Sequence, residues 1–104
     1  MDKIEAIKKL VELKSELLKH ISLKKMFLFG SYANNRQRPD SDIDVAIISP
    51  HIRNSLACTK YLLRKAHQLQ ESNYIIEPHG FHPKEFVDTN PLVWEIKKTG
   101  KKII

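Results

Sequence analysis

The stretch Phe27–Ile48, FLFGSYANNRQRPDSDIDVAII, places two apolar runs on either side of a polar loop. Gly30 and Ser31 stand where the first run ends, and Asp42 and Asp44 stand where the second begins. Short apolar runs bounded by turn residues are typical of buried strands. The stretch therefore predicts two strands whose connecting loop brings a Gly-Ser turn close to two aspartates.

Helical and strand-like patterns alternate along the rest of the chain. We expect strands over 26–29, 43–49 and 74–77, a short helix over 31–35, long helices over 2–20 and 52–70, and helical pieces near 83–87 and 91–98 before a final strand. Pro78 fits only an edge strand or the end of a strand. This order predicts one α/β (α+β) domain over residues 1–104, with a small mixed β-sheet packed against helices.

Composition narrows the class of protein. The chain has 104 residues, of which 41% are hydrophobic and 29% charged, as in an ordinary globular domain. Its net charge of +6 suits a polyanionic partner, but lysines on solvated helix faces explain the charge as well. The single cysteine, Cys58, excludes an internal disulfide. No signal-peptide pattern and no membrane-spanning apolar run is found, so we expect a cytoplasmic protein.

The two aspartates indicate a cation site. Because side chains alternate along a strand, Asp42 and Asp44 are expected to point the same way. Two carboxylates at that spacing repel each other unless a cation lies between them, and Mg²⁺ takes such oxygen ligands together with substrate phosphates. An alternative without metal is that Asp42 caps a turn and Asp44 pairs with a lysine. Backbone amides after Gly30, with the Ser31 hydroxyl, suit a phosphate group, which favours the cation site.

These residues carry a resemblance to a known family. Phe29–Gly30–Ser31, ten residues, and then Asp42–Ile43–Asp44–Val45 are similar to the signature of the DNA polymerase beta-like nucleotidyltransferase superfamily. The chain resembles its minimal nucleotidyltransferase (MNT) subgroup along its whole length. Members often carry a second glycine where this chain has Asn35, and Asn tolerates a positive φ. The resemblance implies the nucleotidyltransferase fold.

The family uses a third carboxylate on a neighbouring strand. Glu77 is the candidate, because it follows the strand-like run YII and matches the family position. The other downstream acids, Glu71, Glu85 and Asp88, fall in a helix end or in polar segments. His79 would share the face of Glu77 if the strand continued beyond Pro78. We expect it instead to be a surface or site-edge histidine.

The resemblance implies a reaction and roles for these residues. Family members transfer a nucleoside monophosphate from an NTP to a hydroxyl and release pyrophosphate. Asp42, Asp44 and Glu77 would be catalytic and would hold one or two Mg²⁺ ions, and Glu77 would take the proton of the attacking hydroxyl. Gly30 and Ser31 would bind the phosphates of ATP, and the loop residues Arg36 and Arg38 would steer the triphosphate or the acceptor.

The MNT subgroup also implies a partner. Its members are commonly encoded with a HEPN-domain toxin and can act as its antitoxin, so the expected acceptor is a hydroxyl, a tyrosine, of such a toxin. An alternative is a non-catalytic antitoxin that neutralises the HEPN partner by complex formation. Direct nucleic-acid binding is not expected, because the chain lacks a basic stripe with interleaved aromatic residues. The base preference, the number of groups transferred and a homo-oligomeric state stay open.

Overall fold

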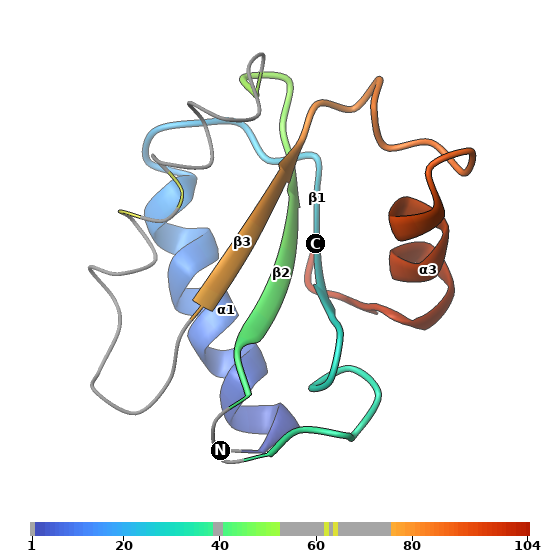
Figure 1. The fold of residues 1–104 in the computed structure, drawn as a ribbon. Coiled ribbons are helices and arrows are strands. Elements are labelled where there is room, and N and C mark those ends of the chain that lie inside the picture. Colours follow the sequence, from blue (N-terminus) through green and yellow to red (C-terminus); the bar gives the residue numbers. More distant parts are fainter. Residues whose placement is uncertain (1, 39–40, 53–61, 63, 65–75) are drawn as a thin grey trace.

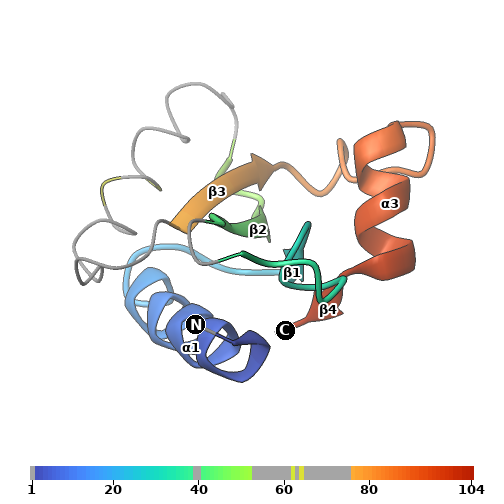
Figure 2. The ribbon, with the colours of Figure 1, turned by 60° about the horizontal axis from the view of Figure 1, so that its bottom comes forward.

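A mixed four-stranded sheet with a helix on each face forms the described part of the chain (Figures 1 and 2). The computed structural model describes residues 2–38, 41–52, 62, 64 and 76–104. The elements are α1 (Lys3–Leu17), β1 (Lys25–Phe29), β2 (Ile43–Ile48), β3 (Ile76–Phe81), α3 (Pro91–Thr99) and β4 (Lys101–Lys102). This architecture confirms the expected α+β class with a small mixed sheet.

The sheet order is β3-β2-β1-β4. β1 pairs antiparallel with β2, so that Phe29 lies opposite Asp44, and β4 pairs antiparallel with the other side of β1. β3 runs parallel to β2 and continues through Pro78 to Phe81. Pro78 lacks a backbone N–H and cannot donate to a neighbouring strand. It is tolerated because β3 lies at an edge of this sheet. The helix expected over 52–70, with Cys58, falls almost wholly outside the described residues.

The alternation of side chains along β1 and β2 divides the core into two clusters. Met26 and Leu28 of β1 face α1, whereas Phe27 and Phe29 face the side of α3. On β2 the α1 face carries Ile43, Val45 and Ile47, and the α3 face carries Asp44, Ala46 and Ile48. Asp44 is thus the polar member of an otherwise apolar row, on the face that α3 covers.

Helix α1 buries one narrow apolar stripe. Asp2 caps its first turn by accepting a hydrogen bond from the Glu5 amide, and the helix buries Ala6, Leu10, Leu13 and Leu17. A second set of apolar side chains at helical spacing, Ile4, Val11 and Leu18, is 65%, 40% and 51% exposed. The reason is geometric, because one sheet face covers only one side of a helix.

The C-terminal segment closes the α3 face. Asn90 caps α3 by accepting a hydrogen bond from the Leu92 amide, and Val93 and Ile96 pack beside Phe27 and Phe86. Residues 83–85 form a hydrogen-bonded turn where a helical piece was expected near 83–87.

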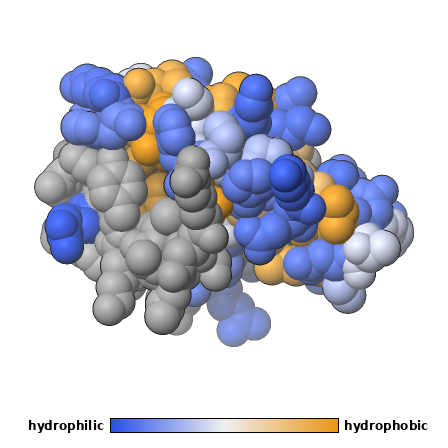
Figure 3. Space-filling view, turned by 90° about the horizontal axis from the view of Figure 1, so that it is seen from above, coloured by the Kyte–Doolittle hydropathy of each residue, from blue (hydrophilic) through white to orange (hydrophobic). Residues whose placement is uncertain are grey.

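The surface of the described chain is mixed. On the face seen in Figure 3, separate hydrophobic patches lie among hydrophilic side chains. Among the described residues, no helix combines the length and the apolar character needed to cross a membrane.

Candidate metal and nucleotide site

The turn after β1 is built around Gly30. Its φ is +75°, in the left-handed region that glycine adopts without strain. A Cβ atom at this position would also overlap the carboxylate of Asp44 and lie 3.2 Å from its Cγ. Position 30 therefore requires glycine for two reasons: the positive φ of the backbone and the close approach of the Asp44 carboxylate. This contact brings the Gly-Ser turn beside the start of β2, as the sequence predicts.

The segment 31–35 is a hydrogen-bonded turn, and the short helix expected there is wrong. The amide and the side chain of Asn34 both donate to the Gly30 carbonyl, at 3.2 and 2.9 Å, and the Arg36 amide donates to the Ser31 carbonyl at 2.8 Å. Asn35 stops the turn from propagating into a helix, because its φ is +56°. The expectation that Asn35 can replace a glycine there by adopting a positive φ is confirmed.

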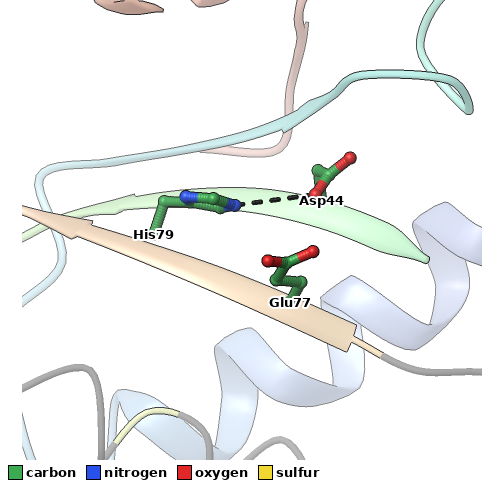
Figure 4. Close-up of side chains that lie close together, drawn as sticks. All are labelled: Asp44, Glu77 and His79. Carbon is green, nitrogen blue, oxygen red and sulfur yellow. Dashed lines mark ion pairs between the residues drawn. The ribbon is translucent and has the colours of Figure 1, made fainter.

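Asp44 and Glu77 are cross-strand partners. The parallel register of β2 and β3 places Asp44 opposite Glu77, so both carboxylates lie on the same face of the sheet (Figure 4). Like charges directly opposite each other destabilise a sheet pair. A cation held between the two carboxylates would offset this repulsion, and a cation site is the chemistry expected for them from the sequence.

His79 joins this pair, although the sequence indicated a surface or site-edge histidine. Because β3 continues through Pro78, His79 lies on the same face as Glu77. Its Nε2 lies 3.5 Å from Oδ1 of Asp44, and Figure 4 shows all three side chains directed to one region. One ligand atom from each of Asp44, Glu77 and His79 lies within 4.8 Å of the others. The strand periodicity Glu77-x-His79 was the signal that could have identified this residue.

Asp42 lies just before β2 and is half-buried. It does not belong to the group of Asp44, Glu77 and His79. Its carboxylate instead acts on Tyr32, whose side chain is only 1% exposed. Burial, and then the charges of Asp42 and Glu5, raise the pKa of Tyr32 above its usual value of 10.0. Asp42 thus acts electrostatically on Tyr32, a residue of the turn after Gly30.

The other nucleotide-binding candidates surround the turn. Ser31 is half-buried, and its hydroxyl makes no hydrogen bond within the described part of the chain. Arg36 and Arg38 are both exposed. The Arg38 amide donates to Oγ of Ser41 at 2.8 Å, which fixes the backbone of the loop at this point. The positions of Gly30 and Ser31 beside Asp44 fit the expected phosphate-binding turn.

The ligand set fits a divalent cation. One ligand atom from each of Asp44, Glu77 and His79 lies within 4.8 Å of the others, a spacing that a single ion with Mg–O bonds of about 2.1 Å could bridge. Two converging carboxylates carry the charge that such an ion neutralises, and the adjacent turn offers amides to the phosphates that share it. Among the described residues, Asp44 and Glu77 are the carboxylates placed to hold the ion.

Two solved structures resemble the fold of this chain. A chain of a toxin–antitoxin complex determined with AMP-PNP has 24% sequence identity and a TM-score of 0.62, over 94% of this chain and 72% of that one. The second is a crystal structure of a protein from Sulfolobus solfataricus that is provisionally assigned as a nucleotidyltransferase. It has 21% sequence identity and a TM-score of 0.61, over 80% of this chain and 72% of that one. At these identities, both likenesses show the fold alone.

A search of curated proteins finds no match. The family model described as "Nucleotidyltransferase domain" matches residues 7–103, nearly the whole sequence. The match includes the Gly30 turn, Asp42 and the convergent residues Asp44, Glu77 and His79. The chain therefore belongs to the nucleotidyltransferase domain family.

Proposed function

We propose that the chain is a magnesium-dependent protein adenylyltransferase, which transfers AMP from ATP to a hydroxyl group of a toxin partner. The observation that carries the proposal is the convergence of Asp44 and Glu77 beside the Gly30 turn. Membership of the nucleotidyltransferase family supports nucleotidyl transfer in general. The toxin–antitoxin neighbour determined with AMP-PNP supports an adenine nucleotide and a toxin partner.

Each residue has a role in this reaction. Asp42, Asp44 and Glu77 would hold one or two Mg²⁺ ions, which neutralise the triphosphate and stabilise the charge of the leaving group. Gly30 allows the chain to turn beneath the phosphates, and the Ser31 hydroxyl is available to donate to a phosphate oxygen. The exposed Arg36 and Arg38 can reach the outer phosphates or the acceptor.

The transfer step replaces one bond at the α-phosphorus of ATP with another. The oxygen of the acceptor hydroxyl forms a bond to the α-phosphorus of ATP, the bond from that phosphorus to the bridging β-oxygen breaks, and pyrophosphate leaves. Glu77 is exposed and so can accept the proton that the hydroxyl loses. We propose a tyrosine of a HEPN toxin as the acceptor, because an added AMP brings charge and bulk beside the toxin's own site.

The test is the intact mass of the HEPN partner after incubation with this protein, ATP and Mg²⁺. We expect an increase by one or more AMP units with the wild type and none with Asp44→Asn. The matched control is Asp88→Asn, which removes an exposed carboxylate that pairs with Lys97 at 2.7 Å outside the site. This control should modify the partner as the wild type does. An unmodified partner with the wild type would contradict the proposal.

A non-catalytic antitoxin is the second candidate, and exposed apolar side chains favour it. Ile4, Val11 and Leu18 form an exposed stripe along α1, and Trp94 on α3 is 51% exposed. Exposed apolar groups of this kind suit a protein interface. If Asp44→Asn neutralises the toxin fully while the wild type leaves its mass unchanged, complex formation alone explains the neutralisation.

A further inference from the structure

In the convergent group of Asp44, Glu77 and His79, His79 is the one residue that offers a nitrogen ligand instead of a carboxylate oxygen. We propose that its imidazole Nε2 is a direct ligand of the bound cation, and that it makes the site prefer a first-row transition-metal dication over Mg²⁺. This inference rests on the proposed function, because it concerns the cation of the same site.

The Nε2 atom of His79 is a buried polar atom that makes no hydrogen bond within the described part of the chain. Its nearest charged neighbour, Oδ1 of Asp44, is 3.5 Å away, beyond the usual length of a strong N–H···O bond. A buried polar atom left unpaired is costly, and a bound ion is one of the few explanations for it in a native fold. The atom is therefore positioned for a ligand that the protein itself does not supply.

Two neighbouring strands fix the direction of the ring. His79 lies opposite Ala46 in the register of β3 with β2, and its ring meets the edge of Phe29 with centroids 5.1 Å apart at 65°. Phe29 is in turn the antiparallel partner of Asp44. Packing against Phe29 thus limits rotation of the imidazole and keeps Nε2 on the side of the carboxylates. A ligand held by packing loses less rotational freedom when the ion binds.

Ligand chemistry then determines the preferred ion. Mg²⁺ binds oxygen ligands and keeps several waters, so an imidazole adds little to its affinity. Transition-metal dications bind imidazole nitrogen well, and the affinity of mixed nitrogen and oxygen sites rises from Mn²⁺ through Co²⁺ toward Cu²⁺. Two carboxylates and one imidazole within 4.8 Å of one another form such a mixed site. A site with His79 as ligand should discriminate in favour of these ions.

The experiment measures binding of Co²⁺ and of Mg²⁺ by calorimetry in the full chain, with and without a non-hydrolysable ATP analogue. The test variant is His79→Gln, which keeps a polar side chain of similar size but replaces the imidazole nitrogen with an amide. The matched control is His20→Ala, which removes an exposed histidine that pairs with Glu16 on α1. Thermal unfolding verifies that each variant is folded.

We expect His79→Gln to weaken Co²⁺ binding about tenfold or more, since even indirect partners of metal ligands act on that scale. The same variant should change Mg²⁺ affinity by less than about twofold, because an amide oxygen is an acceptable Mg²⁺ ligand. The His20→Ala control should retain the wild-type preference. Proton NMR of the Co²⁺ form should show a strongly shifted imidazole N–H that is absent in His79→Gln.

An unchanged ratio of Co²⁺ to Mg²⁺ affinity in His79→Gln, or no shifted imidazole signal in the wild type, would overturn the inference. Asp44→Asn separates this result from a failure of the proposed function. If Asp44→Asn abolishes binding of both ions while His79→Gln leaves their ratio unchanged, the cation site stands and His79 only pairs with Asp44. If the wild type binds neither ion with or without nucleotide, the proposed function fails as well.

Discussion

The carboxylate of Asp44 lies so close to Gly30 that it leaves no room for a side chain there: a Cβ atom on the glycine would overlap it. Gly30 directly follows β1, and Asp44 lies on β2, where it is the cross-strand partner of Phe29. The turn that is suited to phosphates and the carboxylate that is suited to the cation are thus a single packing unit. A change in one of them is expected to be felt by the other.

Gly30→Ala should therefore lower the free energy of unfolding by about 1–2 kcal/mol or more, because it adds left-handed strain to the overlap with Asp44. Chemical denaturation measures the loss. In the Asp44→Ala background the same glycine substitution should cost less, since the carboxylate is gone. Asn35→Gly is the matched control, as its φ is also positive but no carboxylate overlap is involved, and it should be neutral or slightly stabilising. Equal costs in both Asp44 backgrounds would contradict the coupling.

Ser31→Ala should leave stability nearly unchanged and weaken nucleotide binding. Its hydroxyl makes no hydrogen bond within the described residues, so the fold loses little when it is removed. One hydrogen bond to a charged phosphate contributes about 1.5–3 kcal/mol. Calorimetry of ATP binding in Mg²⁺ measures the loss directly. Wild-type affinity in Ser31→Ala would limit the role of Ser31 to the backbone of the turn.

Local sequence patterns predicted the strands of the sheet, because short apolar runs and turn residues act within a few positions. The Gly30 turn, Asp44 and the edge position of β3 follow from such patterns. The turn over 31–35 does not become a helix because Asn35 adopts a positive φ, a choice that the sequence permits without requiring it. Which of two apolar stripes on α1 is buried depends on the sheet, which no helical period specifies.

His79 shows the same limit within the site. Its membership of the site depends on β3 continuing past Pro78, and a proline within a strand argues locally for an end. The parallel register with β2 overrides that local signal, since β3 lies at the edge, where the missing N–H is tolerated. A contact between residues 35 positions apart, such as Asp44 with His79, is set by this register and not by either segment alone.

Glu77→Gln should raise the stability of the protein when no divalent cation is present. Asp44 and Glu77 are opposed like charges, and removing one such charge is worth roughly 0.2–1 kcal/mol. Mg²⁺ with ATP should stabilise the wild type through binding linkage but should stabilise Glu77→Gln much less. Thermal unfolding in EDTA and in Mg²⁺ with ATP measures both effects. Glu95→Gln on the exposed side of α3 is the control, and it should respond to Mg²⁺ with ATP as the wild type does.

Tyr32 gives the fold a predictable response to alkaline pH. Burial and the carboxylates of Asp42 and Glu5 raise its pKa in the folded state above 10.0, whereas the unfolded chain ionises near that value. Above pH 10 the unfolded state therefore loses the phenol proton more readily than the folded state. The stability that this group contributes is complete below pH 10 and is lost as the pH rises toward the folded-state pKa.

Tyr32→Phe removes the ionising group, so its unfolding free energy should decline less between pH 9 and pH 11 than that of the wild type. Asp42→Asn should lie between the two, because it removes one of the charges that raise the pKa and leaves burial as the main cause. Denaturant unfolding across this pH range measures all three proteins. The other two tyrosines contribute equally to wild type and variant, so they cancel in the difference. Identical slopes for wild type and Tyr32→Phe would show that the phenol ionises equally easily in both states, and that Asp42 does not act on it.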